Sequence, residues 1–104
     1  CSAKTACSRD LVAETIKAAR KHGLRVHLYH SLNNWTCDPD AVAAMENKRD
    51  YEKFIKYTFD RLRELVTKYN PIDVLWYDGW WPFNSDDWQA ETMFGAMSSC
   101  GMAQ

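Results

Sequence analysis

Two strand-like segments, each preceded by an amphipathic helix, constrain the fold of this chain more than any other feature. The first pair is a helix over residues 9–22 followed by a strand over 24–31 in which apolar and polar residues alternate. The second pair is a longer helix over 51–69 followed by a mostly apolar strand over 72–78. Alternation of helices with strands is typical of right-handed βαβ units on a parallel sheet. The sequence therefore predicts an α/β fold.

Capping and breaking residues set the expected boundaries of these elements. Ser8 is the expected N-cap of the first helix, and Gly23 is the expected residue just after its end. Pro71 stops the second helix, because proline cannot continue one. Residues 32–47 begin as a turn-rich connection, and a final helix is expected near residues 87–99.

Two strands do not complete a parallel sheet, because such sheets are normally covered on both faces and two strands leave two open edges. A (β/α)8 barrel needs about 250 residues, whereas this chain has 104. We therefore expect a partial (β/α)8 TIM-like barrel, about two βα units with flanking helices, in which residues 1–104 are a fragment of one larger domain. The chain opens on Cys1 rather than Met, which is expected of an internal or processed start.

Charge and composition exclude several function classes. The 13 Lys and Arg residues against 14 Asp and Glu residues give a net charge of −1, which provides no basic footprint for nucleic acid. No apolar run has the roughly 18–20 residues needed to span a membrane. The spacing of the cysteines and histidines fits no zinc motif, so we expect no metal and no cofactor. The sequence leaves the disulfide status of the cysteines open, and these are Cys1, Cys7, Cys37 and Cys100.

The two strand ends are the places where a barrel would carry its chemistry, because active sites lie at the carboxyl ends of barrel strands. Tyr29 and His30 stand at the end of the first strand, and Trp76 and Asp78 at the end of the second. Side chains alternate along a strand, so Trp76 and Asp78 share a face. A carboxylate at the end of an apolar strand is costly to bury without a partner, which favours a functional role.

Aromatic residues follow this carboxylate directly, as Trp80 and Trp81. Flat apolar rings beside a carboxylate suit a sugar, whose C–H faces pack on aromatic rings and whose hydroxyls need polar partners. Such a carboxylate can also attack an anomeric carbon. Structural roles stay open from the sequence: Asp78 could brace the loop, the tryptophans could pack in the core, and His30 could be a structural histidine.

Two segments carry a resemblance to a known family. They are RDLVAETIKAARKHGLRVHLYHSLNNW and YEKFIKYTFDRLRELVTKYNPIDVLWYDGWW, of which WYDG is the most specific part. Together they resemble the central part of the α-L-fucosidase family of retaining glycoside hydrolases. The resemblance implies that Asp78 is the catalytic nucleophile, that Trp76 lines the sugar site, and that Tyr29 and His30 contribute to the sugar pocket. Many members of the family have a second tyrosine where this chain has His30.

The resemblance also implies a substrate and a missing group. It implies removal of terminal α-L-fucosyl residues from fucosylated glycans with net retention, and a general acid/base that lies beyond Gln104. We therefore expect the chain alone to be inactive. Two alternatives remain: a non-catalytic carbohydrate-binding or interaction module, and a retaining glycosidase for another sugar. The oligomeric state and the cellular compartment stay open.

Overall fold

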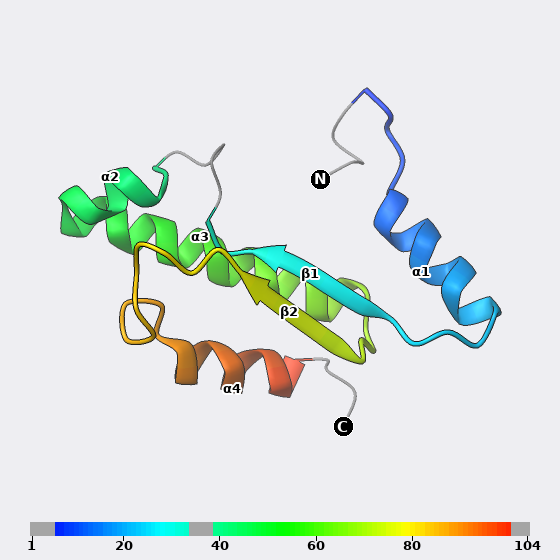
Figure 1. Ribbon diagram of the computed structural model, residues 1–104. Helices are drawn as coiled ribbons and strands as arrows, with labels where there is room; N and C mark the ends of the chain where they lie inside the picture. The colour runs from blue at the N-terminus through cyan, green and yellow to red at the C-terminus, as the bar shows by residue number, and fades with distance from the viewer. Residues whose placement is uncertain (1–5, 34–38, 101–104) are drawn as a thin grey trace.

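The computed structural model describes residues 6–33 and 39–100, and within these ranges it contains four helices and two strands (Figure 1). In chain order they are α1 (Leu11–Lys21), β1 (His27–Ser31), α2 (Ala41–Glu46), α3 (Lys48–Lys68), β2 (Val74–Asp78) and α4 (Ala90–Cys100). The alternation of helices with strands is as predicted, and the fold is mixed α/β. The short helix α2 is the element that the sequence pattern did not predict.

Helix α1 begins two residues later than the sequence suggested, and its N-cap is Asp10 rather than Ser8. The Asp10 carboxylate accepts a hydrogen bond from the Ala13 amide at 3.0 Å, which satisfies one of the unpaired N–H groups of the first turn. Ser8 instead adopts a positive φ of 51°. At the other end Gly23 has a φ of 71°, as expected for the residue that follows a helix.

The two strands pair in parallel, with Tyr29 opposite Trp76 and Ser31 opposite Asp78. Strand β1 is shorter than predicted because the backbone before it bonds differently. The Val26 amide donates to the Asp73 carboxylate at 2.8 Å, and the Val26 carbonyl accepts from the Asp73 amide at 2.9 Å. These two hydrogen bonds to Asp73 replace the regular strand-to-strand hydrogen bonds at Val26.

Among the described helices, α3 contributes the largest set of buried apolar side chains, namely Phe54, Ile55, Leu62 and Val66. The predicted apolar face is confirmed, since Phe54, Leu62 and Val66 are fully buried. The helix starts at Lys48 because Asn47 caps it by accepting from the Asp50 amide at 2.9 Å. Burial of a whole apolar side chain contributes about 1.5–3 kcal/mol. Packing of this face on its neighbours therefore makes a substantial contribution to the stability of the fold.

Helix α4 packs beside α3 and adds to the same core. Met93 and Met97 are buried and α4 contacts α3, while the loop before α4 buries Trp88 next to Phe54, with ring centroids 5.6 Å apart. Figure 1 shows α3 behind the sheet, α4 beneath it and α1 standing to one side. In the part of the chain that the structure describes, no helix covers the sheet face that points away from α3 and α4.

Candidate functional site

The carboxyl ends of β1 and β2 meet at one edge of the sheet because the strands are parallel. The register places Ser31 beside Asp78 at this edge, and the Leu32 amide donates to the Asp78 carbonyl at 2.8 Å. The loop that follows β1 and the loop that follows β2 therefore start side by side. This is the position at which the sequence predicted the site.

Tyr29, Trp76 and Asp78 share the uncovered face of the sheet. Tyr29 is 62% exposed and Trp76 is 59% exposed, and the register places them opposite each other. The Tyr29 hydroxyl donates a hydrogen bond to Oδ2 of Asp78 at 3.1 Å. The structure thus brings together a carboxylate, a phenol and an indole from two strands.

Gly79 fixes the other oxygen of the same carboxylate. Its amide donates to Oδ1 of Asp78 at 2.7 Å. Gly79 has a φ of +68°, and a Cβ added there would lie 3.0 Å from Oγ of Ser31. Only glycine combines this backbone conformation with so close a neighbour at low cost. Both oxygens of Asp78 are therefore held by donors from the residues around it.

The charge of Asp78 acts back on its phenol partner. The hydrogen bond to Asp78 raises the pKa of Tyr29 above its ordinary value, and desolvation and the negative charge of the carboxylate act in the same direction. The phenol therefore stays protonated at neutral pH and remains a donor to Asp78. This pair is the central polar contact of the candidate site.

His30 lies on the opposite face of the sheet from Asp78, as strand alternation requires. It is half-buried, and burial lowers its pKa, with the positive charge of Arg61 on α3 adding to the effect. The structure therefore does not bring His30 together with Tyr29, Trp76 and Asp78. Between the two residues that the sequence offered at the end of the first strand, Tyr29 is the one beside the carboxylate.

The side chains of Trp80 and Trp81 are 63% and 52% exposed. Their backbone carbonyls are held by hydrogen bonds from two buried residues. The indole N–H of Trp88 donates to the Trp80 carbonyl at 2.6 Å, and the Asn33 amide group donates to the Trp81 carbonyl at 3.0 Å. These bonds hold the loop while both rings stay open to solvent. A non-catalytic binding module would be expected to stack sugars on Phe83 and Trp88 as well, but both side chains are buried in the core.

Asn33 is a site residue that sequence reasoning missed. It follows β1 by two residues, is 5% exposed, and its carbonyl accepts from the Ser31 hydroxyl at 3.0 Å. Two asparagines after a strand are typical of a turn, and nothing in that pattern signals a buried side chain that holds the neighbouring loop. The link appears only once the two strand ends are side by side.

Among residues 6–33 and 39–100 no group of three His, Cys, Asp or Glu side chains could hold a metal ion. None of the helices in that part has the length and apolar content needed to cross a bilayer. Cys7 and Cys100 are free thiols, and Cys1 and Cys37 lie outside the described residues.

Comparisons with known proteins agree on one family. A family model described as alpha-L-fucosidase matches residues 1–101. The chain is 36% identical over 83 residues to the tissue alpha-L-fucosidases of Rattus norvegicus and Homo sapiens, covering 79% of this chain and 18% and 17% of those proteins. It is 30% identical over 92 residues to the alpha-L-fucosidase of Dictyostelium discoideum, covering 86% of this chain and 20% of that protein. The chain thus spans about a fifth of the length of these relatives. No solved structure matches the chain significantly.

Proposed function

The chain belongs to the alpha-L-fucosidase family, and from this premise we propose that it is the part of an alpha-L-fucosidase that carries the catalytic nucleophile, Asp78. The substrate is a terminal α-L-fucosyl residue on a fucosylated glycan. The observation that carries the proposal is the Asp78 carboxylate held by Tyr29 and Gly79 at the carboxyl end of two parallel strands. No cofactor is needed for this chemistry.

The reaction proceeds in two displacements. One oxygen of Asp78 attacks the anomeric carbon while the bond to the leaving oxygen breaks, and a general acid outside this chain gives that oxygen its proton. Water then attacks the same carbon, the glycosyl–Asp78 bond breaks, and the group that acted as acid takes the proton from water. Two inversions give net retention.

Tyr29 and Gly79 position the nucleophile in this scheme. Their hydrogen bonds hold the carboxylate in one orientation, so that little freedom is lost when it reacts. Trp76 lies beside this pair on the same face and supplies an apolar surface for the sugar ring, and the exposed rings of Trp80 and Trp81 extend that surface. His30 faces the helices, so we assign it no contact with the sugar.

The proposed fold of the whole enzyme is a (β/α)8 barrel, of which residues 1–104 form part of the catalytic domain. The parallel pairing of β1 and β2, the contact between α3 and α4, and the packing of Phe94 of α4 against Tyr77 of β2 support this arrangement. The face with Tyr29, Trp76 and Asp78 would then point into the barrel. The matched region covers 18% of the relative from Rattus norvegicus, and a protein of that length has room for the remaining βα units.

The test replaces Asp78 in the full-length protein that contains this sequence. Asp78→Asn and Asp78→Gly should lower kcat for an aryl α-L-fucoside by more than about 10³-fold while fucose still binds, because the covalent step is lost. Added azide should restore turnover of the Asp78→Gly variant and yield the fucosyl azide of inverted configuration. Asp86→Asn, which changes an exposed carboxylate in the following loop, is the matched control and should keep its activity.

Retained turnover in Asp78→Gly without azide would place the nucleophile elsewhere. A panel of aryl glycosides on the unmodified enzyme tests the sugar, and preference for another sugar would make the protein a retaining glycosidase of different specificity.

The exposed tryptophans favour one second candidate, a carbohydrate-binding module without catalysis. Trp80 and Trp81 present open rings of the kind on which sugars stack. If the complete, unmodified protein binds fucose but hydrolyses no fucoside, this result would support the second function over the first.

A further inference from the structure

Ser31 shares the candidate-site face of the sheet with Tyr29 and Asp78, and the proposed mechanism does not use it. It is the last residue of β1, and the register pairs it with Asp78, the last residue of β2. Tyr29 lies two residues earlier on the same strand, so its side chain points to the same face. The hydroxyl of Ser31 and the carboxylate of Asp78 therefore emerge side by side.

The Ser31 hydroxyl adjoins the donor that holds one oxygen of the nucleophile. The Tyr29 phenol donates to Oδ2 of Asp78 at 3.1 Å. The bond to Asp78, desolvation and the carboxylate charge raise the pKa of Tyr29, and a hydrogen bond from Ser31 to the phenol oxygen opposes this rise in part. A donor behind the phenol polarises its O–H group, which strengthens the bond from the phenol to the carboxylate.

The same hydroxyl packs against the donor that holds the other oxygen. The Gly79 amide donates to Oδ1 of Asp78 at 2.7 Å. A Cβ added to Gly79 would lie 3.0 Å from Oγ of Ser31, so this oxygen stands directly against the glycine. One hydroxyl group is therefore in contact with both donors that orient the nucleophile.

A backbone carbonyl fixes the place of this hydroxyl. The carbonyl of Asn33 lies 3.0 Å from Oγ of Ser31, within the turn that follows β1. A serine hydroxyl has one proton, and rotation about its C–O bond can direct that proton to this carbonyl or to the Tyr29 oxygen. Ser31 thus connects the start of the turn to the phenol beside the carboxylate.

We propose that Ser31 is a positioning residue for the nucleophile: its hydroxyl holds the Tyr29 phenol and, through it, the Asp78 carboxylate in the orientation for attack. The proposal rests on the proposed function and adds to it a residue that acts through Tyr29 without contact to the sugar. A nucleophile held in one orientation loses little freedom when it reacts. Loss of the hydroxyl should therefore slow the attack and leave the affinity for the sugar unchanged.

The first test removes the hydroxyl in the full-length protein that contains this sequence. Ser31→Ala should lower kcat/KM for an aryl α-L-fucoside about tenfold, the scale of one hydrogen bond in a charged cluster. The inhibition constant of fucose as a competitive inhibitor should stay the same. Ser99→Ala is the matched control, because Ser99 on α4 is exposed and also donates its hydroxyl to a backbone carbonyl. It should leave both quantities unchanged.

A second pair of variants separates the hydroxyl from the size of the side chain. Ser31→Thr and Ser31→Val add nearly the same bulk beside Gly79, and only threonine keeps a hydroxyl. The threonine variant should therefore have about tenfold higher kcat/KM than the valine variant. This comparison holds even where the added bulk slows both enzymes.

A double-mutant cycle tests whether Ser31 acts through Tyr29. Tyr29→Phe removes the phenol oxygen that links the Ser31 hydroxyl to Asp78. In the Tyr29→Phe enzyme, Ser31→Ala should therefore change kcat/KM less than about twofold, because the two residues belong to one hydrogen-bonded chain.

Three results would overturn the proposal: a tenfold loss that persists in the Tyr29→Phe enzyme, equal activities of the threonine and valine variants, or unchanged kcat/KM in Ser31→Ala. An inhibition constant of fucose that rises in step with the loss of kcat/KM would also overturn it, because Ser31 would then contact the sugar itself. Turnover retained by Asp78→Gly without azide would instead overturn the proposed function. That measurement involves no change at Ser31, so the two failures are distinguished.

Discussion

Gly79 shows how a single residue positions the candidate site. It turns the chain away from β2 at a φ of +68°, donates to the Asp78 carboxylate at 2.7 Å and leaves room for the Ser31 hydroxyl. Gly23 has almost the same φ, +71°, but a Cβ added there would meet nothing within 4 Å. The two glycines thus share a backbone requirement and differ in their surroundings.

Replacement of each glycine by alanine separates these effects. Gly23→Ala should lower the free energy of unfolding by about 1–2 kcal/mol, the cost of the left-handed conformation. Gly79→Ala should lower the free energy of unfolding by about 1–3 kcal/mol more than Gly23→Ala does, because its Cβ crowds Ser31. It should also lower kcat about tenfold by shifting Asp78. Urea denaturation and steady-state kinetics of the full-length variants measure both. Equal stability losses and unchanged kcat in both would contradict this account.

At the scale of single residues, strand alternation predicted which side chains share a face, but not which partners they meet. Alternation along the strands predicted that Trp76 and Asp78 share a face, and the structure places them so. It could not decide between Tyr29 and His30, because that choice depends on how β1 pairs with β2. Asn33 was missed for the same reason, since its partner Trp81 lies 48 residues away along the chain.

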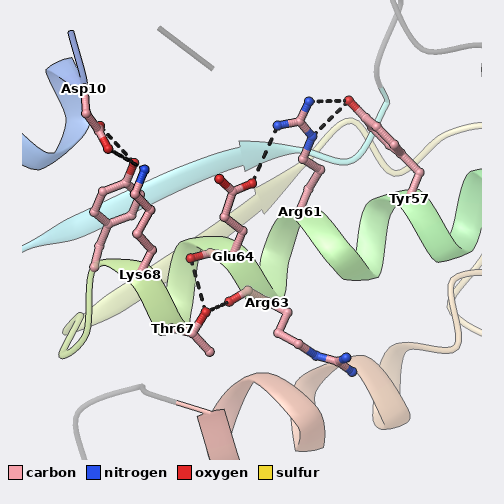
Figure 2. Close-up of polar contacts among 8 residues, drawn as sticks. Asp10, Tyr57, Arg61, Arg63, Glu64, Thr67 and Lys68 are labelled. Carbon is pink, nitrogen blue, oxygen red and sulfur yellow. Dashed lines mark hydrogen bonds and ion pairs between the residues drawn. The ribbon is translucent and has the colours of Figure 1, made fainter. Parts of the chain in front are cut away.

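At the scale of elements, α1 is joined to the C-terminal end of α3 by polar contacts at both ends of α1. Arg20 donates to the carbonyls of Tyr69 and Pro71 at 2.6 and 2.5 Å. Figure 2 shows the other end, where Asp10 meets Lys68 on α3, at 2.5 Å; the Tyr69 hydroxyl also donates to Asp10, at 2.9 Å. The same carboxylate caps α1, so Asp10 serves both as helix cap and as tether.

The tether predicts a pH dependence. The hydrogen bond from Lys68, followed by that from the Ala13 amide, lowers the pKa of Asp10 from 3.8 to about 2. A lowered pKa means that the stabilisation is fully present above about pH 4 and is lost as the pH falls toward 2. Asp10→Asn should therefore weaken protection of the α1 amides at pH 6, and the difference from wild type should shrink toward pH 2.

Hydrogen exchange of peptides from α1 and α3 in the full-length protein measures this difference. Peptides from the middle of α3 are the internal control and should exchange alike in both proteins. A difference between variant and wild type that stays constant from pH 6 to pH 2 would show that the charge of Asp10 is not the cause.

The elements themselves followed from periodicity where the pattern was long. The apolar face of α3 repeats over about five turns, and Phe54, Leu62 and Val66 on that face are fully buried. Helix α2 has six residues, too few for a periodic signal, and depends on the Asp40 cap and on contact with α3. The first residues predicted for β1 do not belong to the strand, because the Val26 amide donates a hydrogen bond to the side chain of Asp73. No local sequence pattern encodes this contact.

At the scale of the molecule, the isolated chain should not hydrolyse fucosides. Retaining hydrolysis needs two carboxyl groups about 5–5.5 Å apart, and our proposal places only Asp78 in this chain. We expect no measurable release of 4-nitrophenol from an aryl α-L-fucoside by the purified 104-residue chain, with the full-length enzyme as positive control. Turnover by the chain alone that is lost in Asp78→Asn would show that the second group lies within it.

Only a count of the expected strands led from the sequence to the proposed barrel. Two parallel strands with exposed Tyr29 and Trp76 on one face require further cover, but nothing in 104 residues specifies what provides it. Family membership supplies the length of the relatives and so supports the larger domain. The arrangement of the remaining units therefore stays a proposal.

The pairing of Tyr29 with Trp76 and of Ser31 with Asp78 has a consequence for mutation of the gene. Deletion of one codon within β1 would rotate every later side chain of that strand to the other face, so that an imidazole would replace the phenol beside the carboxylate or the pairing would slip. A codon lost from the turn at residues 84–86 would instead remove local hydrogen bonds, such as those that the Asn84 side chain accepts from the Asp86 and Asp87 amides, and would leave the register of β1 and β2 unchanged. In-frame deletions should therefore be more damaging to the candidate site in the strand than in this turn.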